Sequence, residues 1–150
     1  MPDRFVLRYH YQETWHLWHA LWFCTMGLGA ALFLLRQFFS IEDAGTIWGM
    51  SLPDVLGIVL VAVGGLILIA DLGRPLRILN ALRKPGRSWI ARGGIADFAF
   101  IGLGILYVLP GLFPGLPWSD AVFADAGPGT RVLIVLMALM AVLIAVYPGL

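Results

Sequence analysis

The stretch "VLGIVLVAVGGLILIA", residues 55–70, contains neither a charged residue nor any other polar side chain. A helix rises about 1.5 Å per residue, so roughly 20 residues cross a hydrocarbon core of about 30 Å. Leu52 and Leu72 extend this run to nearly that length. A helix of a soluble protein would carry polar residues on one face at helical spacing, and this run has none. The stretch therefore predicts a helix that spans a membrane.

Three further charge-free runs cover residues 14–35, 98–119 and 132–150. The whole chain is 60% hydrophobic and only 13% charged, with a mean hydropathy of +0.87. The short alternating segments of a transmembrane β-barrel are absent. We therefore predict an all-α integral membrane four-helix bundle, formed by residues 1–150 as a single domain. The expected spans are residues 15–39, 54–71, 89–112 and 131–148.

Glycines recur inside the predicted spans. Without side chains they allow neighbouring helices to approach closely, so we expect a compact bundle. The positions concerned are Gly27, Gly29, Gly57, Gly64, Gly65, Gly102 and Gly104.

Basic residues lie mostly on one side of the predicted bundle. With four spans, the N-terminus, the 72–92 loop and the C-terminus share one side, and that side carries eight of the ten Lys and Arg residues. Lys and Arg are retained on the cytoplasmic side during membrane insertion. We therefore predict a multi-pass protein of a bacterial or archaeal cytoplasmic membrane, with the basic side in the cytoplasm. A partner that docks outside the cell would require the opposite orientation, which this bias does not forbid.

The segment between the second and third spans, "IADLGRPLRILNALRKPGRSWIARGG" (69–94), holds six of the ten basic residues. Pro75 suits the first turn of a helix, and Gly86 suits the position after its end. Between them an apolar residue recurs every third position, at Leu76, Leu79 and Leu82. This pattern predicts a short amphipathic helix near 75–84 along the membrane surface. Its positive charges would contact either anionic lipid or a partner.

Asp97 is a charged residue inside the third predicted span. It follows Arg92 by five residues, roughly 7.5 Å along the helix axis. A carboxylate at that depth is costly unless it is paired or faces a wet cavity, and it is therefore a functional candidate. An ion pair with Arg92 or Arg74 is the structural alternative.

Two motifs of the 69–94 segment resemble a known family. "DLGRPLRILNAL" (71–82) followed by "SWIARGG" (88–94) is similar to the signature of the NrfD/polysulfide-reductase membrane subunits, which are related to the membrane anchors of dimethyl-sulfoxide reductases. The first span, "LWFCTMGLGAALFLL" (21–35), resembles the glycine-rich first helix of that family. The closing "AVYPGL" (145–150) resembles the end of its fourth helix.

This resemblance implies a function. Such subunits react with a quinone or quinol and exchange electrons with an iron–sulfur subunit resembling a four-cluster ferredoxin, which serves a separate catalytic subunit. The cofactor would be menaquinone or ubiquinone, with no haem or metal bound by this chain. Family members have eight or more spans. The chain would therefore be the N-terminal half of such a subunit, a non-catalytic component that requires a second half or a second chain.

The residues can be compared with what a quinone site requires: an apolar slot, hydrogen-bond partners for the ring oxygens, and a titratable route to water. Histidine titrates near neutral pH, and His16 and His19 share a helix face. We expect His19 and Asp97 to transfer protons. The residues expected to bind the quinone are His16, His19, Arg92, Asp97 and Tyr147. The residues expected to dock the partner are Asp71, Arg74, Ser88 and Arg92. All fall toward the basic side, and the opposite ends of the spans offer no comparable set.

Structural roles remain open for several of these residues. His16 is equally suited to the membrane interface, and Tyr147 to an aromatic belt. Ser88 can cap the third helix. Asp71 and Arg74 can form a clasp that orders the loop. These alternatives concern single residues and leave the predicted fold unchanged.

Other classes of protein compete with the quinone hypothesis. A haem anchor draws histidines from two facing helices, whereas His10, His16 and His19 all lie in or before the first span. Half of a transporter would show polar residues or broken helices at the membrane midplane, which these spans lack. A passive structural anchor requires nothing more than the charged loop and remains an alternative. Nothing in the sequence indicates nucleic-acid binding.

Overall fold

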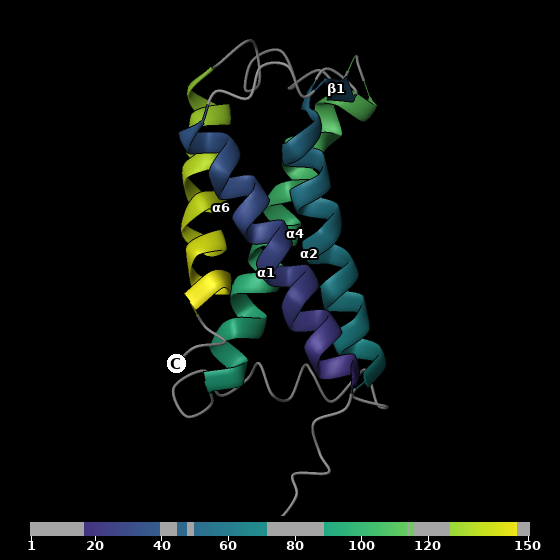
Figure 1. Ribbon diagram of the computed structural model, residues 1–150. Coiled ribbons are helices and arrows are strands. Elements are labelled where there is room, and N and C mark those ends of the chain that lie inside the picture. Colours follow the sequence, from purple (N-terminus) through teal and green to yellow (C-terminus); the bar gives the residue numbers. More distant parts are fainter. Residues whose placement is uncertain are drawn as a thin grey trace, which may run out of the picture.

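In the residues that it describes, the computed structural model contains four long helices that run up and down through a bundle (Figure 1). It describes residues 17–39, 45–47, 50–71, 89–113, 115 and 127–146, with the backbone alone for Asp71, Trp89 and Ile90. The helices are α1 (Leu17–Phe38), α2 (Leu52–Asp71), α4 (Trp89–Leu112) and α6 (Pro128–Val146). Each contains a segment long and apolar enough to cross a membrane. The predicted all-α membrane bundle is thereby confirmed.

Two helices begin earlier than the sequence analysis expected, and each has a proline in its first turn. α2 begins at Leu52 with Pro53 next, and α6 begins at Pro128. Proline is favoured there because the first helical N–H groups have no intrahelical acceptor. The N–H of Arg131 donates to the carbonyl of Gly127 at 3.2 Å, which closes the first turn of α6. Charge-free runs mark the hydrophobic part of a span, whereas proline marks its start.

A small hairpin joins α1 to α2. Strands β1 (Thr46–Ile47) and β2 (Met50–Ser51) pair antiparallel, with Thr46 opposite Ser51. Gly45 has a φ of 82°, which a glycine adopts without strain, and its carbonyl accepts the N–H of Leu52 at 3.1 Å. The hairpin therefore leads directly into α2. The predicted surface helix near 75–84 lies outside the described residues.

The helices form a ring in which α2 lies beside α1, α4 beside α2, and α6 beside both α4 and α1. Each helix contributes one fully buried large side chain to the centre: Val61, Phe33, Phe100 and Met137. Phe33 of α1 and Phe100 of α4 meet edge to face across this centre, with ring centroids 5.3 Å apart. Long apolar side chains cover the outside, as lipid-facing surfaces require.

Glycines set the separation of α1 and α2. A Cβ on Gly29 would lie 2.7 Å from the carbonyl oxygen of Gly57, and a Cβ on Gly64 would overlap Met26. These backbones therefore touch, as predicted for small residues in a membrane bundle. The prediction is wrong for Gly27 and Gly102, where an added Cβ would meet nothing within 4 Å. Glycine content alone does not reveal which helix face is in contact.

Candidate functional site: an apolar cavity with one carboxyl group

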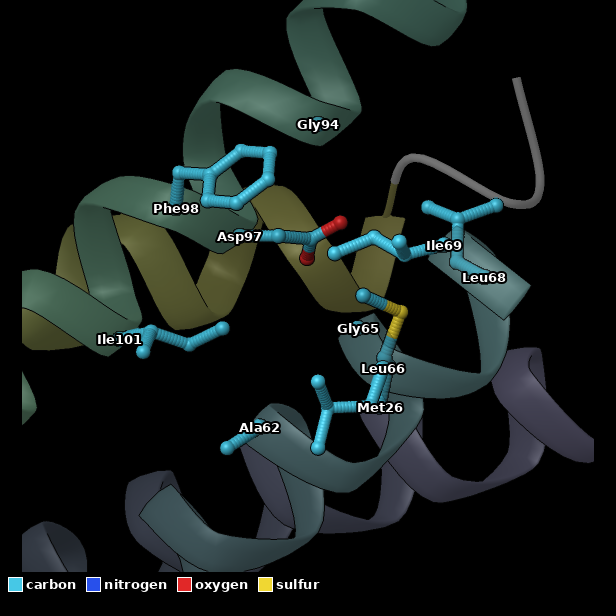
Figure 2. Close-up of a pocket in the computed structure, with 10 residues that line it drawn as sticks. All are labelled: Met26, Ala62, Gly65, Leu66, Leu68, Ile69, Gly94, Asp97, Phe98 and Ile101. Carbon is cyan, nitrogen blue, oxygen red and sulfur yellow. The ribbon is translucent and has the colours of Figure 1, made fainter. Parts of the chain in front are cut away.

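A cavity of about 240 Å³ lies between α2 and α4 and reaches Met26 of α1 (Figure 2). Both main helices present one face to it, at the i, i+3, i+4, i+7 spacing of a helical stripe. The lining residues of α2 at this spacing are Ala62, Gly65, Leu66 and Ile69, and those of α4 are Gly94, Asp97, Phe98 and Ile101. Leu68 completes the wall. Small residues on both helices leave the space that larger side chains would fill.

Asp97 provides the single charged group of this wall. Its side chain is only 6% exposed, and Figure 2 shows the carboxylate directed from α4 toward α2. No hydrogen bond or ion pair joins it to another described residue. A buried carboxyl group without a partner is destabilising, because desolvation is not offset. Such a group is a candidate functional residue.

The cavity opens toward the outside of the bundle. Leu66 and Phe98, which line it from opposite helices, are 65% and 42% exposed. In a bilayer, exposed apolar side chains at this depth face lipid. A hydrophobic molecule dissolved in the membrane would therefore reach Asp97 sideways, without passing through water. The lining, apolar except for one precisely placed polar group, is typical of a small-molecule site.

His19 and Arg92 were predicted to join Asp97, and neither lines the cavity. His19 is half-buried on α1, seven residues before Met26, and so shares its helix face about 10 Å nearer the membrane surface. Arg92 is exposed on α4. Five helical residues turn the chain by about 1.4 turns, so Arg92 and Asp97 point to different sides of α4. The proposed Arg92–Asp97 ion pair is not formed.

The other predicted site residues lie beyond what the structure describes. Asp71 ends α2, and only its backbone is described. The rest lie outside the described residues: His16, Arg74, Ser88 and Tyr147. The ends of α2 and α4 that flank the 72–88 segment do lie at the same end of the bundle as the start of α1 (Figure 1). Asp97 lies in the half of α4 nearest this end.

One expectation was wrong: the opposite end of the bundle also gathers polar residues. Asp54 of α2 is 4% exposed and accepts hydrogen bonds from two helices. The Nε2 of Gln37 donates to its Oδ1 at 3.0 Å, and the hydroxyl of Tyr107 donates to its Oδ2 at 3.2 Å. The Nε of Arg36 donates to Ser51 Oγ at 2.9 Å. Folding brings these residues together from three helices and the hairpin, which the sequence alone does not reveal.

Sequence reasoning also missed the residues that shape the cavity. Gly65 and Gly94 lie on the cavity faces of α2 and α4, and Met26 reaches it from α1. The signal for part of this face was available, because Gly94 and Asp97 are spaced i, i+3 on one helix. Nothing in the sequence indicated that α2 is the helix opposite.

The fold and the site together define a multi-pass membrane protein with an apolar cavity between two of its helices. A family model described as "Polysulphide reductase, NrfD" matches residues 6–150, nearly the whole chain. The chain therefore belongs to the NrfD family, as the motifs predicted, and is a membrane subunit that fits the anchor of a redox complex. No curated protein and no solved structure matches the chain.

Proposed function

We propose that this chain is the membrane anchor and quinone-reactive subunit of a respiratory oxidoreductase complex. The observation that carries this proposal is the apolar cavity that opens toward lipid and holds one buried carboxyl group, Asp97. A quinone is a membrane-dissolved ring with polar oxygens and a long apolar tail. The cavity volume suits the ring, and the opening beside Leu66 and Phe98 allows the tail to remain in lipid.

The chain's own residues would supply binding, orientation and proton transfer, whereas the quinone carries the redox chemistry. The apolar walls from α2 and α4 exclude water and hold the ring flat between the helices. The carboxylate of Asp97 accepts a proton from a quinol hydroxyl, and its protonated form donates one to a quinone oxygen. His19, on the same face as Met26 but nearer the surface, is suited to pass that proton toward water.

The partner proposed for this subunit is an iron–sulfur protein, docked at the end of the bundle that carries the 72–88 segment, with a catalytic subunit beyond it. Family membership and the concentration of positive charge in that segment support this part. Docking is assigned to Asp71, Arg74, Ser88 and Arg92. The complex lies in a cytoplasmic membrane, with the basic side facing the cytoplasm, and a second half or second chain completes the subunit.

Photoaffinity labelling with an azidoquinone tests the quinone site in native membranes. Ala62→Phe fills the cavity, whereas Val63→Phe adds the same ring at the next position, whose side chain is 40% exposed and outside the lining. We expect labelled peptides from α2 and α4 that disappear in Ala62→Phe and persist in Val63→Phe. Equal labelling in both variants would reduce the protein to a passive anchor.

Co-purification tests the partner. A planar guanidinium holds a carboxylate by two bonds, which lysine cannot do. Arg74→Lys or Arg92→Lys should therefore weaken recovery of the iron–sulfur subunit, whereas Arg83→Gln combined with Lys84→Gln should change it little. Equal losses would indicate bulk electrostatics. Protease protection in intact and inverted vesicles determines the side of docking.

A further inference from the structure

The polar cluster around Asp54 lies at the end of the bundle away from the cavity and joins three helices. Gln37 of α1 and Tyr107 of α4 each donate to a different oxygen of the Asp54 carboxylate. Arg36 adds a positive charge nearby. An ionised carboxylate only accepts hydrogen bonds, and here both oxygens are occupied by donors. The arrangement fits a permanently held carboxylate rather than one that takes up a ligand.

The two hydrogen bonds to Asp54 stabilise two different helix interfaces, and the α2–α4 interface depends more on its bond than the α1–α2 interface does. α1 and α2 are already in backbone contact through Gly29, Gly57 and Gly64, so the Gln37 bond strengthens an interface that is close without it. α2 and α4 line the cavity along part of their length, so their packing against each other is incomplete there. The hydrogen bond from Tyr107 to Asp54 joins α4 directly to α2.

The hydrogen bond and the cavity occupy opposite ends of the same interface. Tyr107 follows Asp97 by ten residues on α4, about 15 Å along the axis, and Gly65 follows Asp54 by eleven residues on α2, about 16 Å. Between the hydrogen bond and the cavity, α4 touches α2 at Gly104, where an added Cβ would lie only 2.9 Å from the side chain of Ile58. A helix is stiff over this distance, so fixing one end restricts the other.

We propose that Asp54 and Tyr107 are positioning residues that hold α4 against α2 and thereby set the separation of these helices at the cavity. This separation fixes where Asp97 stands relative to the opposite wall. The effect of this separation on quinone binding rests on the proposed function, whereas the effect of Asp54 and Tyr107 on the helix separation does not. Gln37 bonds to the same carboxylate and has no comparable influence on the cavity, because α1 and α2 are held by their glycines.

The test compares two substitutions that each remove one donor to Asp54: Tyr107→Phe and Gln37→Met. The full-length protein carries Cys24→Ser and spin labels at Val63 of α2 and Ile95 of α4, which neighbour the cavity but do not line it. Pulsed electron paramagnetic resonance should give a longer or broader distance distribution in Tyr107→Phe and an unchanged one in Gln37→Met. A label pair at Leu21 and Val63, across α1 and α2, should not change in either variant.

Kinetics provide the second measurement. An interhelical hydrogen bond in a membrane is worth a factor of about three to twenty in an equilibrium constant, so Tyr107→Phe should raise the KM for quinol by up to that factor. Gln37→Met should leave the KM within about twofold. If no variant or wild-type protein binds quinol, the proposed function fails, and the distances still decide the positioning role. Identical distances in Tyr107→Phe and wild type would overturn that role whatever the kinetics.

Asp54→Asn separates positioning from proton transfer. The asparagine oxygen accepts from Tyr107, and its amide donates to Gln37 once the Gln37 amide turns over. We therefore expect wild-type distances, turnover and pH profile. Loss of turnover with unchanged distances would assign Asp54 to proton transfer and contradict the proposal.

Discussion

The two buried aspartates of the described bundle have opposite surroundings. Asp97 lies in an apolar cavity and forms no hydrogen bond to a described residue, whereas Asp54 receives one from each of two helices. Burial is nearly the same, at 6% and 4% exposure. Burial of a carboxyl group therefore does not by itself distinguish the proton-transfer role proposed for Asp97 from the positioning role proposed for Asp54. The distinction lies in whether the protein supplies the donors that the carboxylate needs.

The largest expected effect is on turnover. Asp97→Asn keeps the shape of the side chain and removes the proposed proton carrier, so the proposed quinol-linked turnover should fall by about 10²- to 10⁴-fold, the usual contribution of a general acid or base. Asp54→Asn serves as the matched control and should stay close to wild type. Turnover is measured in membranes that contain the partner subunits. A similar loss in both variants would erase the distinction between the two aspartates.

The second effect concerns the free energy of unfolding, which should respond differently to leucine at the two positions. Asp54→Leu leaves the donors of Gln37 and Tyr107 without an acceptor, and should lower the free energy of unfolding by about 1–3 kcal/mol. Asp97→Leu removes a buried carboxyl group that forms no hydrogen bond to a described residue, and should be neutral or stabilising. Thermal unfolding in detergent measures both. Destabilisation by Asp97→Leu as large as that by Asp54→Leu would mean that Asp97 has a structural partner.

The third effect concerns the interface between α1 and α2, the helix that carries Asp54 and lines one wall of the cavity. Gly29→Ala places a Cβ 2.7 Å from the Gly57 carbonyl oxygen, and overpacking of this kind costs about 1–3 kcal/mol. Gly27→Ala, two residues earlier on the same helix, meets nothing within 4 Å and should be neutral or slightly stabilising. The same unfolding assay compares them. Equal stability of the two variants would contradict the close contact of α1 and α2.

The smallest effect is expected at His19, which shares a helix face with Met26 but does not line the cavity. His19→Phe keeps a ring and removes both nitrogens, so turnover should fall by about fivefold, the equivalent of one ordinary hydrogen bond. Trp18→Phe, at an exposed neighbouring position, is the control. A loss as large as that of Asp97→Asn would place His19 directly in proton transfer.

Sequence reasoning was most successful where a property belongs to a single helix. The four spans follow from charge-free runs, and Asp97 was identified because a carboxyl group inside a predicted span is rare. It failed where several helices contribute. Arg92 precedes Asp97 by only five residues yet points to another side of α4. The Asp54 cluster was missed because its members, Gln37, Asp54 and Tyr107, are polar residues near span ends that look unremarkable one at a time.

The sequence by itself determined that the chain crosses a membrane, how often the helices of the described bundle do so, and which family it belongs to. These properties depend on local hydropathy and short motifs, because an apolar run must form a helix in lipid whatever surrounds it. Only the tertiary structure decided which helix faces meet, where the cavity lies, and which aspartate has partners. Those outcomes depend on contacts between residues as far apart as Asp54 and Tyr107, 53 positions along the chain, and such contacts form only when the helices pack together.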